Sequence, residues 1–170
     1  MIRIIILAAM LPLLSGCDKQ TPSLYEVGIE RDFDIPAGLN NIETHYLYLR
    51  NVPTFYKQYA DSRGLDNTTI ASVRAARGLI RSDFQTFGYD FIDRISISVV
   101  SRKDPLQKRE MYYLDDVPFN TGDELRMLSS ATELKDIISE EFVDIEVRMN
   151  IRTSTGTAVR SKLIFSYAVF

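Results

Sequence analysis

The sequence predicts a mainly β protein, an antiparallel β-sandwich with one short helix near residues 130–141. Two observations favour this class. Apolar and polar residues alternate through several segments, as they do on strands with one buried face. Turn-forming residues separate these segments, and the chain lacks the long helical segments that connect parallel strands. The chain has 170 residues, of which 45% are hydrophobic, so one domain can bury a core of its own.

We expect the first residues to be a targeting signal rather than part of the folded domain. Arg3 precedes an apolar run from Ile4 to Leu14, and the small residues Ser15 and Gly16 stand before Cys17. This order is typical of a secretory signal. The run is shorter than the about 20 residues that a membrane-spanning helix needs.

The sequence divides into three parts at this point. We expect a signal peptide over residues 1–16, a polar tether over 17–23, and a single β domain over 24–170. The tether contains Pro22, and no later stretch is rich enough in Pro, Gly or Ser to mark a second boundary.

The first predicted strand contains four apolar residues of one parity, interrupted by Arg31: Val27, Ile29, Phe33 and Ile35. The spacing predicts one buried face.

Three segments follow. Residues 42–49 are rich in the β-branched and aromatic types that suit strands, and residues 55–60 are compatible with a turn of helix. Residues 68–81 fit either a helix face or a strand with a bulge. Gly78 weakens a helix there, and the β-rich surroundings favour a strand.

The middle of the chain predicts a hairpin. Ile95, Ile97 and Val99 alternate with polar residues, the loop 102–108 turns the chain, and residues 110–114 return as the partner strand. The helix near 130–141 is predicted by Ser130 and Glu133, which have the spacing of a capping box.

The clearest alternation lies near the C-terminus. Apolar residues take every second position from Val143 to Ile151, and the pattern resumes from Val159 to Val169. The short loop between them contains Gly156, so the two strands are predicted to form a hairpin.

Composition and charge exclude several classes of function. The net charge is −3, with one Cys, one His and no Trp. Neither a Cys/His zinc cluster nor an intrachain disulfide can be built, and no cofactor or metal is expected. Nucleic acid is not an expected partner because its binding requires a basic face.

His45 is the only candidate for a catalytic triad. It lies inside a predicted strand, and no Gly-x-Ser-x-Gly motif accompanies it. A hydrolase remains one hypothesis, a hydrogen-bonded strand histidine is the other, and we expect no enzymatic activity.

Two further sites are candidates for ligand binding. Asp115, Asp116 and Asp123 lie in one acidic segment, whose oxygen atoms suit calcium although their spacing does not match an EF-hand loop. Tyr46 and Tyr48 share the strand face opposite Leu49, and they would suit a carbohydrate or a peptide if that face is exposed. A solvated loop and a packed strand are the alternatives.

Arg74, Arg77 and Arg81 would share one face if their segment is a helix. Such a row suits anionic lipid headgroups. An ordinary solvated surface is the alternative.

The residues Leu14-Ser15-Gly16-Cys17 resemble the lipobox of bacterial lipoproteins. The resemblance implies cleavage before Cys17, diacylglycerol on its thiol and palmitate or a similar acyl chain on its amine. Several acyl chains hold a protein stably on a membrane, so the resemblance implies a membrane-anchored protein without a free thiol.

The lipobox and the predicted architecture together resemble the small immunoglobulin-like β-sandwich lipoproteins of Bacteroidetes-like bacteria. This resemblance implies a binding or scaffolding role in the cell envelope, with an envelope protein as partner. Asp18 resembles an inner-membrane retention signal in enteric-type bacteria, whereas charge after the lipidated Cys resembles a surface-export signal in Bacteroidetes-like ones. The membrane and leaflet therefore stay open.

Overall fold

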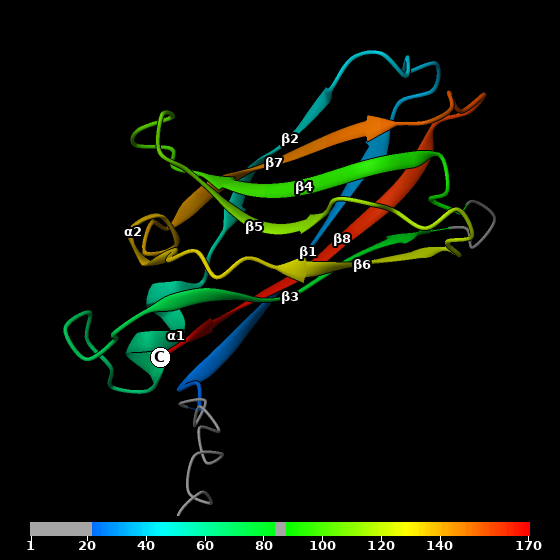
Figure 1. The fold of residues 1–170 in the computed structure, drawn as a ribbon. Helices are drawn as coiled ribbons and strands as arrows, with labels where there is room; N and C mark the ends of the chain where they lie inside the picture. Colours follow the sequence, from blue (N-terminus) through cyan, green and yellow to red (C-terminus); the bar gives the residue numbers. More distant parts are fainter. Residues whose placement is uncertain (1–21, 84–87) are drawn as a thin grey trace, which may run out of the picture.

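The computed structural model describes residues 22–83 and 88–170, which form eight strands and two short helices (Figure 1). The signal peptide and Cys17 lie outside the described residues. The elements, in chain order, are β1 (Tyr25–Ile35), β2 (His45–Pro53), α1 (Tyr56–Ser62), β3 (Val73–Ser82), β4 (Ile92–Val100), β5 (Lys108–Leu114), β6 (Glu124–Ser129), α2 (Lys135–Ile138), β7 (Phe142–Ile151) and β8 (Val159–Val169).

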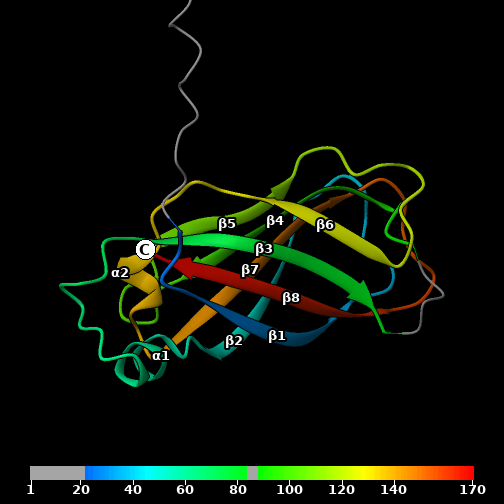
Figure 2. The ribbon, with the colours of Figure 1, turned by 90° about the horizontal axis from the view of Figure 1, so that it is seen from below.

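The strands form one antiparallel sheet in the order β1-β8-β3-β6-β5-β4-β7-β2. The sheet curls until its two end strands, β1 and β2, approach each other, so that it is a nearly closed, barrel-like sheet (Figures 1 and 2). Its halves, β1-β8-β3-β6 and β5-β4-β7-β2, are joined by a short ladder in which only Tyr112 and Tyr113 pair with Ser129 and Leu128.

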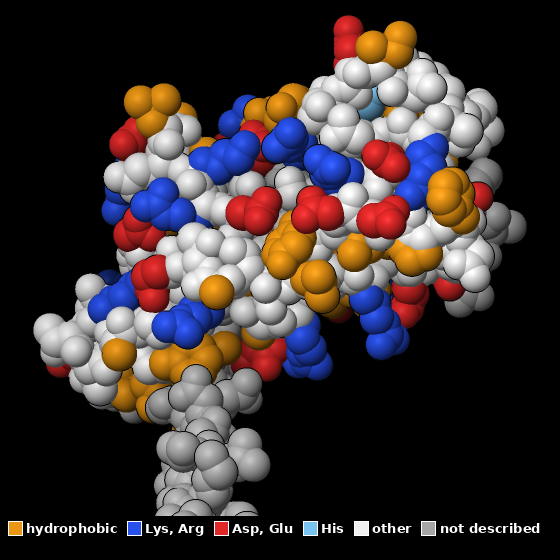
Figure 3. Space-filling model, viewed as in Figure 1, with side chains coloured by type: hydrophobic (Ala, Val, Ile, Leu, Met, Phe, Trp, Pro, Cys, Tyr) orange, Lys and Arg blue, Asp and Glu red, His pale blue; other side chains and the backbone are white. Residues whose placement is uncertain are grey.

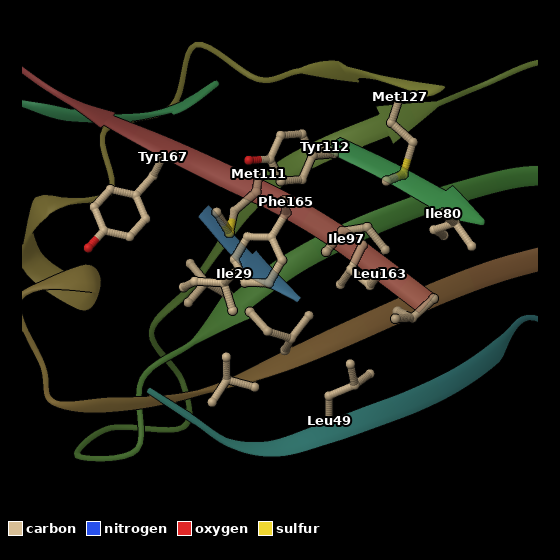
Figure 4. Close-up of a cluster of buried hydrophobic side chains, with 14 of the residues drawn as sticks. Ile29, Leu49, Ile80, Ile97, Met111, Tyr112, Met127, Leu163, Phe165 and Tyr167 are labelled. Carbon is tan, nitrogen blue, oxygen red and sulfur yellow. The ribbon is translucent and has the colours of Figure 1, made fainter. Parts of the chain in front are cut away.

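The core fills the inside of this barrel. Alternate residues of the strands point inward, and Figure 4 shows Ile29, Leu49, Ile97 and Phe165 converging from four different strands. Ile97 and Leu163 are completely buried. Burial of this apolar surface is the main driving force for folding, since it contributes roughly 25 cal/mol per Å².

The structure confirms the mainly β class and most of the predicted strands. The segment 68–81, for which a helix was the alternative, contains β3. The hairpin predicted in the middle of the chain is present, because β4 pairs with β5 from Ile95↔Leu114 to Val100↔Lys108.

The hairpin predicted at the C-terminus is wrong. The strand β7 pairs with β2 and β4, whereas β8 pairs with β1 and β3. The loop 152–158 therefore crosses between the halves of the barrel. Alternation specifies which face of a strand is buried, but it carries no information about the neighbouring strand.

The helices differ from the prediction in extent. The turn of helix considered for residues 55–60 is present as α1, at Tyr56–Ser62, and the helix near 130–141 is restricted to α2. The capping box does not form: the residue before α2 is Leu134, and no side chain caps the helix. The carboxylate of Glu133 instead accepts hydrogen bonds from the backbone N–H groups of Val73 and Lys135.

The strand β6 was not predicted. Leu125 and Met127 are its buried residues, whereas Arg126 and Leu128, which alternate with them, are exposed. The alternation extends over only six residues. Because an acidic segment typical of a loop precedes it, the pattern does not clearly indicate a strand there.

Candidate functional site

The strand β2 displays two tyrosines on the outside of the barrel. Leu49 faces the core, whereas Tyr46 and Tyr48 lie on the opposite face and are each 48% exposed. The exposed face of β2 is therefore the tyrosine face, defined here as Tyr46 and Tyr48.

Charged residues of the neighbouring strand β7 contact Tyr48 of the tyrosine face and Arg50 beside it. The hydroxyl of Tyr48 donates to Glu146 at 3.0 Å, and Glu146 also pairs with Lys108 of β5. The guanidinium of Arg50 lies 4.8 Å from the centre of the Tyr48 ring and 2.5 Å from Asp144. These contacts hold Tyr48 in one orientation.

The pKa values of this network follow from its hydrogen bonds. The bond to the Glu146 carboxylate, together with burial, raises the pKa of Tyr48. Burial opposes ionisation of Asp144, but hydrogen bonds from Arg50 and from the Asn51 backbone outweigh it and hold the Asp144 pKa below its usual value. The tyrosine hydroxyl is therefore neutral and the carboxylate charged near neutral pH.

Along the described chain, the edge of β2 that faces β1 carries no ladder, although the two strands approach each other where the barrel nearly closes. β7 is the only partner of β2 in the sheet that the structure describes. An unpaired edge presents N–H and C=O groups to which another extended chain can bond. Asn51, with a φ of 55°, lies in the irregular segment between Leu49 and Val52 that ends the regular part of this edge.

The acidic segment is neutralised by arginines rather than left free. Arg94 lies 3.6 Å from Asp115, and Arg152 lies 3.2 Å from both Asp93 and Asp116.

Asp123 has a different contact, since its backbone carbonyl accepts a hydrogen bond from Ser82. Among residues 22–83 and 88–170, no group of three or more His, Cys, Asp or Glu residues has the arrangement of a metal site. The calcium hypothesis therefore gains no support from the geometry.

Arg152 is a residue that sequence reasoning missed. Its side chain is only 14% exposed, donates to the backbone carbonyls of Ile92 and Val117, and stacks 4.1 Å from the centre of the Phe119 ring. Its sequence position, directly after the alternating segment, gave no sign that it organises a loop distant in the chain.

The His45 ring contacts a backbone carbonyl rather than a nucleophilic side chain. Its Nε2 atom lies 2.6 Å from the backbone carbonyl oxygen of Asn40. Within the described residues, this is the hydrogen bond that the ring makes, and no serine hydroxyl contacts it. The arrangement offers no support for the hydrolase hypothesis.

Comparison of the chain with protein-family models, with curated proteins and with solved structures finds no match. A separate observation concerns membranes: the helices found in the described ranges are too short to span a bilayer.

Proposed function

We propose that this protein is a membrane-anchored lipoprotein of the bacterial envelope that binds another envelope component and does not catalyse a reaction. The lipobox at Leu14–Cys17 supports the anchor. The open edge of β2 carries the proposed binding role, because it lies beside the tyrosine face and offers both backbone and side-chain contacts.

An extended segment of a partner protein fits this edge best. Such a segment would add a strand next to β2, where backbone hydrogen bonds supply affinity and alternate side chains supply specificity. Aromatic residues are enriched at protein interfaces because they bury a large area with few rotatable bonds. Tyr46 and Tyr48 have this chemistry.

We also propose that the barrel-like sheet is a flattened form related to the immunoglobulin-like β-sandwich. The short β5–β6 ladder supports this relation, because it leaves the two four-stranded halves nearly separate. An experimental structure in which the halves face each other as two packed sheets would bear it out, and an evenly round barrel would contradict it.

The anchor is tested by mass spectrometry of the protein purified from its own membrane. We expect the chain to begin at Cys17 and to carry acyl chains. The Cys17→Ser variant should lose both the acylation and the cleavage. An unmodified Cys17 in the native protein would remove the proposed anchor.

The binding edge is tested by photo-crosslinking in cells. A crosslinking amino acid at Tyr48 should give one discrete adduct, and the same amino acid at Leu106, which is 93% exposed in a loop, should not. Tyr46→Lys should weaken the adduct, since edge lysines disfavour strand addition. Equal labelling at both positions would argue against a specific edge.

A carbohydrate ligand is a second candidate, favoured by the two half-exposed rings on one face. A glycan that raises the melting temperature of the wild type, but not that of Tyr46→Ala, would support this function. An unchanged melting temperature with a glycan panel, with calcium and with EDTA would exclude both ligand-binding alternatives.

A further inference from the structure

The arginines of β3 lie on one outer face even though the segment is a strand. In a regular strand, Arg74 and Arg77 would point to opposite sides. The register of β3 against β8 shifts between Ala75 and Arg77, so that Arg74 lies opposite Ala168 and Arg77 lies opposite Ser166. This bulge places Arg74 on the same side as Arg77 and Arg81.

Other side chains complete this surface. Arg126 of β6 lies opposite Leu79 of β3, and its side chain is 84% exposed. Leu79, Leu128 and Ile164 line a hollow of about 630 Å³. We define the arginine face as the outer surface that these residues form together: Arg74, Arg77, Leu79, Arg81, Arg126, Leu128 and Ile164. Figure 3 shows blue Lys and Arg side chains below an orange hydrophobic group over β6 and β3.

The described chain begins beside this face. Pro22 and Ser23 line a hollow together with Arg74 and Ala168. Pro22 lies five positions after Cys17, and five steps of extended chain reach at most about 18 Å. The 11 residues of β8 span about 36 Å. A lipid on Cys17 would therefore hold this corner of the barrel close to the membrane, whereas the far loops lie beyond its reach.

We propose that the arginine face lies on the membrane and binds the headgroups of anionic phospholipids. The proposal rests on the proposed function, because it needs the anchor at Cys17. Arginine suits phosphate groups because its planar guanidinium donates several hydrogen bonds. Leu79, Leu128 and Ile164 add apolar contact between the charges.

Acidic side chains border the face on β1 and β6. Glu30 and Asp32 of β1 lie 3.8 Å and 3.7 Å from Lys162 of β8, which lies between Asp32 and Arg81 in the sheet. Glu26 lies 3.0 Å from Arg77, and Glu124 lies 3.4 Å from Arg126. Both arginines are 84% exposed, so these are weak surface pairs. Arg74 and Arg81 have no ion pair with any residue that the structure describes.

The absence of tryptophan from the chain makes the test direct. Leu128→Trp places a single fluorescent reporter on the arginine face, and Ile42→Trp places one in a distant loop that is 89% exposed. Each full-length variant is purified from the membrane of a lipoprotein-processing bacterium and reconstituted in vesicles. The vesicles contain phosphatidylglycerol and a phosphatidylcholine with a nitroxide on its headgroup. We expect quenching at position 128 and not at position 42.

Charge reversal tests the role of the arginines. Each arginine near an anionic surface raises the equilibrium constant for contact between the face and the membrane about fivefold. The double substitution Arg77→Glu and Arg126→Glu should therefore lower this constant at least about 25-fold. Quenching of Leu128→Trp should then fall to the level of the Ile42→Trp control. Arg148→Glu makes one such charge reversal on the exposed outer side of β7 and should have no effect. Ser129→Trp is a second reporter if Leu128→Trp melts at a lower temperature than the wild type.

Three results would overturn the proposed membrane face, and each has a different cause. Unquenched fluorescence at position 128 in a protein acylated at Cys17 would overturn the membrane face and leave the proposed function intact. A blue-shifted emission without quenching would show that a protein covers the face instead, and it would also overturn the proposal. An unacylated Cys17 would remove the anchor and, with it, this inference.

Discussion

Gly78 and Tyr112 join β3 to β5 through a close contact in the core. The Tyr112 hydroxyl donates a hydrogen bond to the backbone carbonyl of Ser166 on β8, and its ring packs edge-on against Phe165 with 6.5 Å between ring centres. The ring also lies directly over Gly78. One tyrosine thus connects three strands, and glycine at position 78 leaves the room that this requires.

We expect Gly78→Ala to destabilise the fold by about 1–3 kcal/mol, the usual cost of overpacking a core. A Cβ atom there would lie 2.6 Å from Cγ and Cδ1 of the Tyr112 ring. The measurement is urea-induced unfolding. Gly28→Ala is the matched control, because a Cβ atom at that position meets nothing within 4 Å. Equal effects of the two substitutions would contradict the packing argument.

Buried tyrosines should make the fold sensitive to high pH. Burial raises the pKa of Tyr89 to about 12, and burial also raises the pKa values of Tyr112 and Tyr167. The unfolded chain ionises near pH 10. The stability that these neutral hydroxyls contribute is therefore complete below that pH, and it is lost as the pH rises through the folded pKa of about 12.

The measurement for this prediction is the free energy of unfolding as a function of pH, with phenolate absorbance as a second readout. Tyr89→Phe removes one ionising group and should reduce the alkaline loss, although it also removes the 2.9 Å bond to the Ser161 hydroxyl. Ionisation of all nine tyrosines near pH 10 in the folded protein would refute the argument.

Elements of this fold are held by contacts that local patterns do not reveal. The residues Ser130 and Glu133 have the spacing of a helix cap, yet Glu133 binds the first residue of β3, 60 positions away in the chain. The backbone N–H of Leu134 donates to the carbonyl of the same residue, Val73, at 2.9 Å. A capping pattern predicts a nearby helix, but tertiary contacts decide which donors the carboxylate meets.

Glu133→Ala should loosen this junction between α2 and β3. We expect faster hydrogen exchange at the amides of Val73 and Lys135, and a loss of about 1–3 kcal/mol, because hydrogen bonds to charged groups are stronger than average. Glu141→Ala is the control, since Glu141 is exposed and contributes its backbone carbonyl rather than its side chain to Thr54. Unchanged exchange at Val73 would contradict the role of the carboxylate.

At the scale of the whole molecule, the first and the last strands of the described chain pair with each other. The strand β1 pairs along its length with β8, from Tyr25↔Val169 to Ile35↔Val159. The first strand therefore has no hydrogen-bonded partner until the last one is present. Pairings so distant in sequence make folding slow, in milliseconds to seconds, because the chain must lose much entropy before the contacts form.

Phe165 of β8 tests how the two halves of the barrel pack against each other. Its side chain is 1% exposed and contacts Tyr112 from the other half of the barrel. We expect Phe165→Ala to cost about 3–5 kcal/mol in denaturant-induced unfolding monitored by circular dichroism. Ile164→Ala, on the outer face of the same strand, should cost much less. Equal costs would show that the two faces of β8 are not distinguished by burial.

The sequence by itself determined the β class, most of the strands and the face of each strand that is buried, because alternation of side chains is a local property. The resemblance to a lipobox is likewise a local property, because it lies in the four consecutive residues Leu14–Cys17. Only the tertiary structure decided that β7 and β8 belong to opposite halves, that β2 keeps an open edge, and that a bulge gathers Arg74 with Arg77 and Arg81. Strand partners and bulges depend on contacts between distant segments, and no local pattern encodes them.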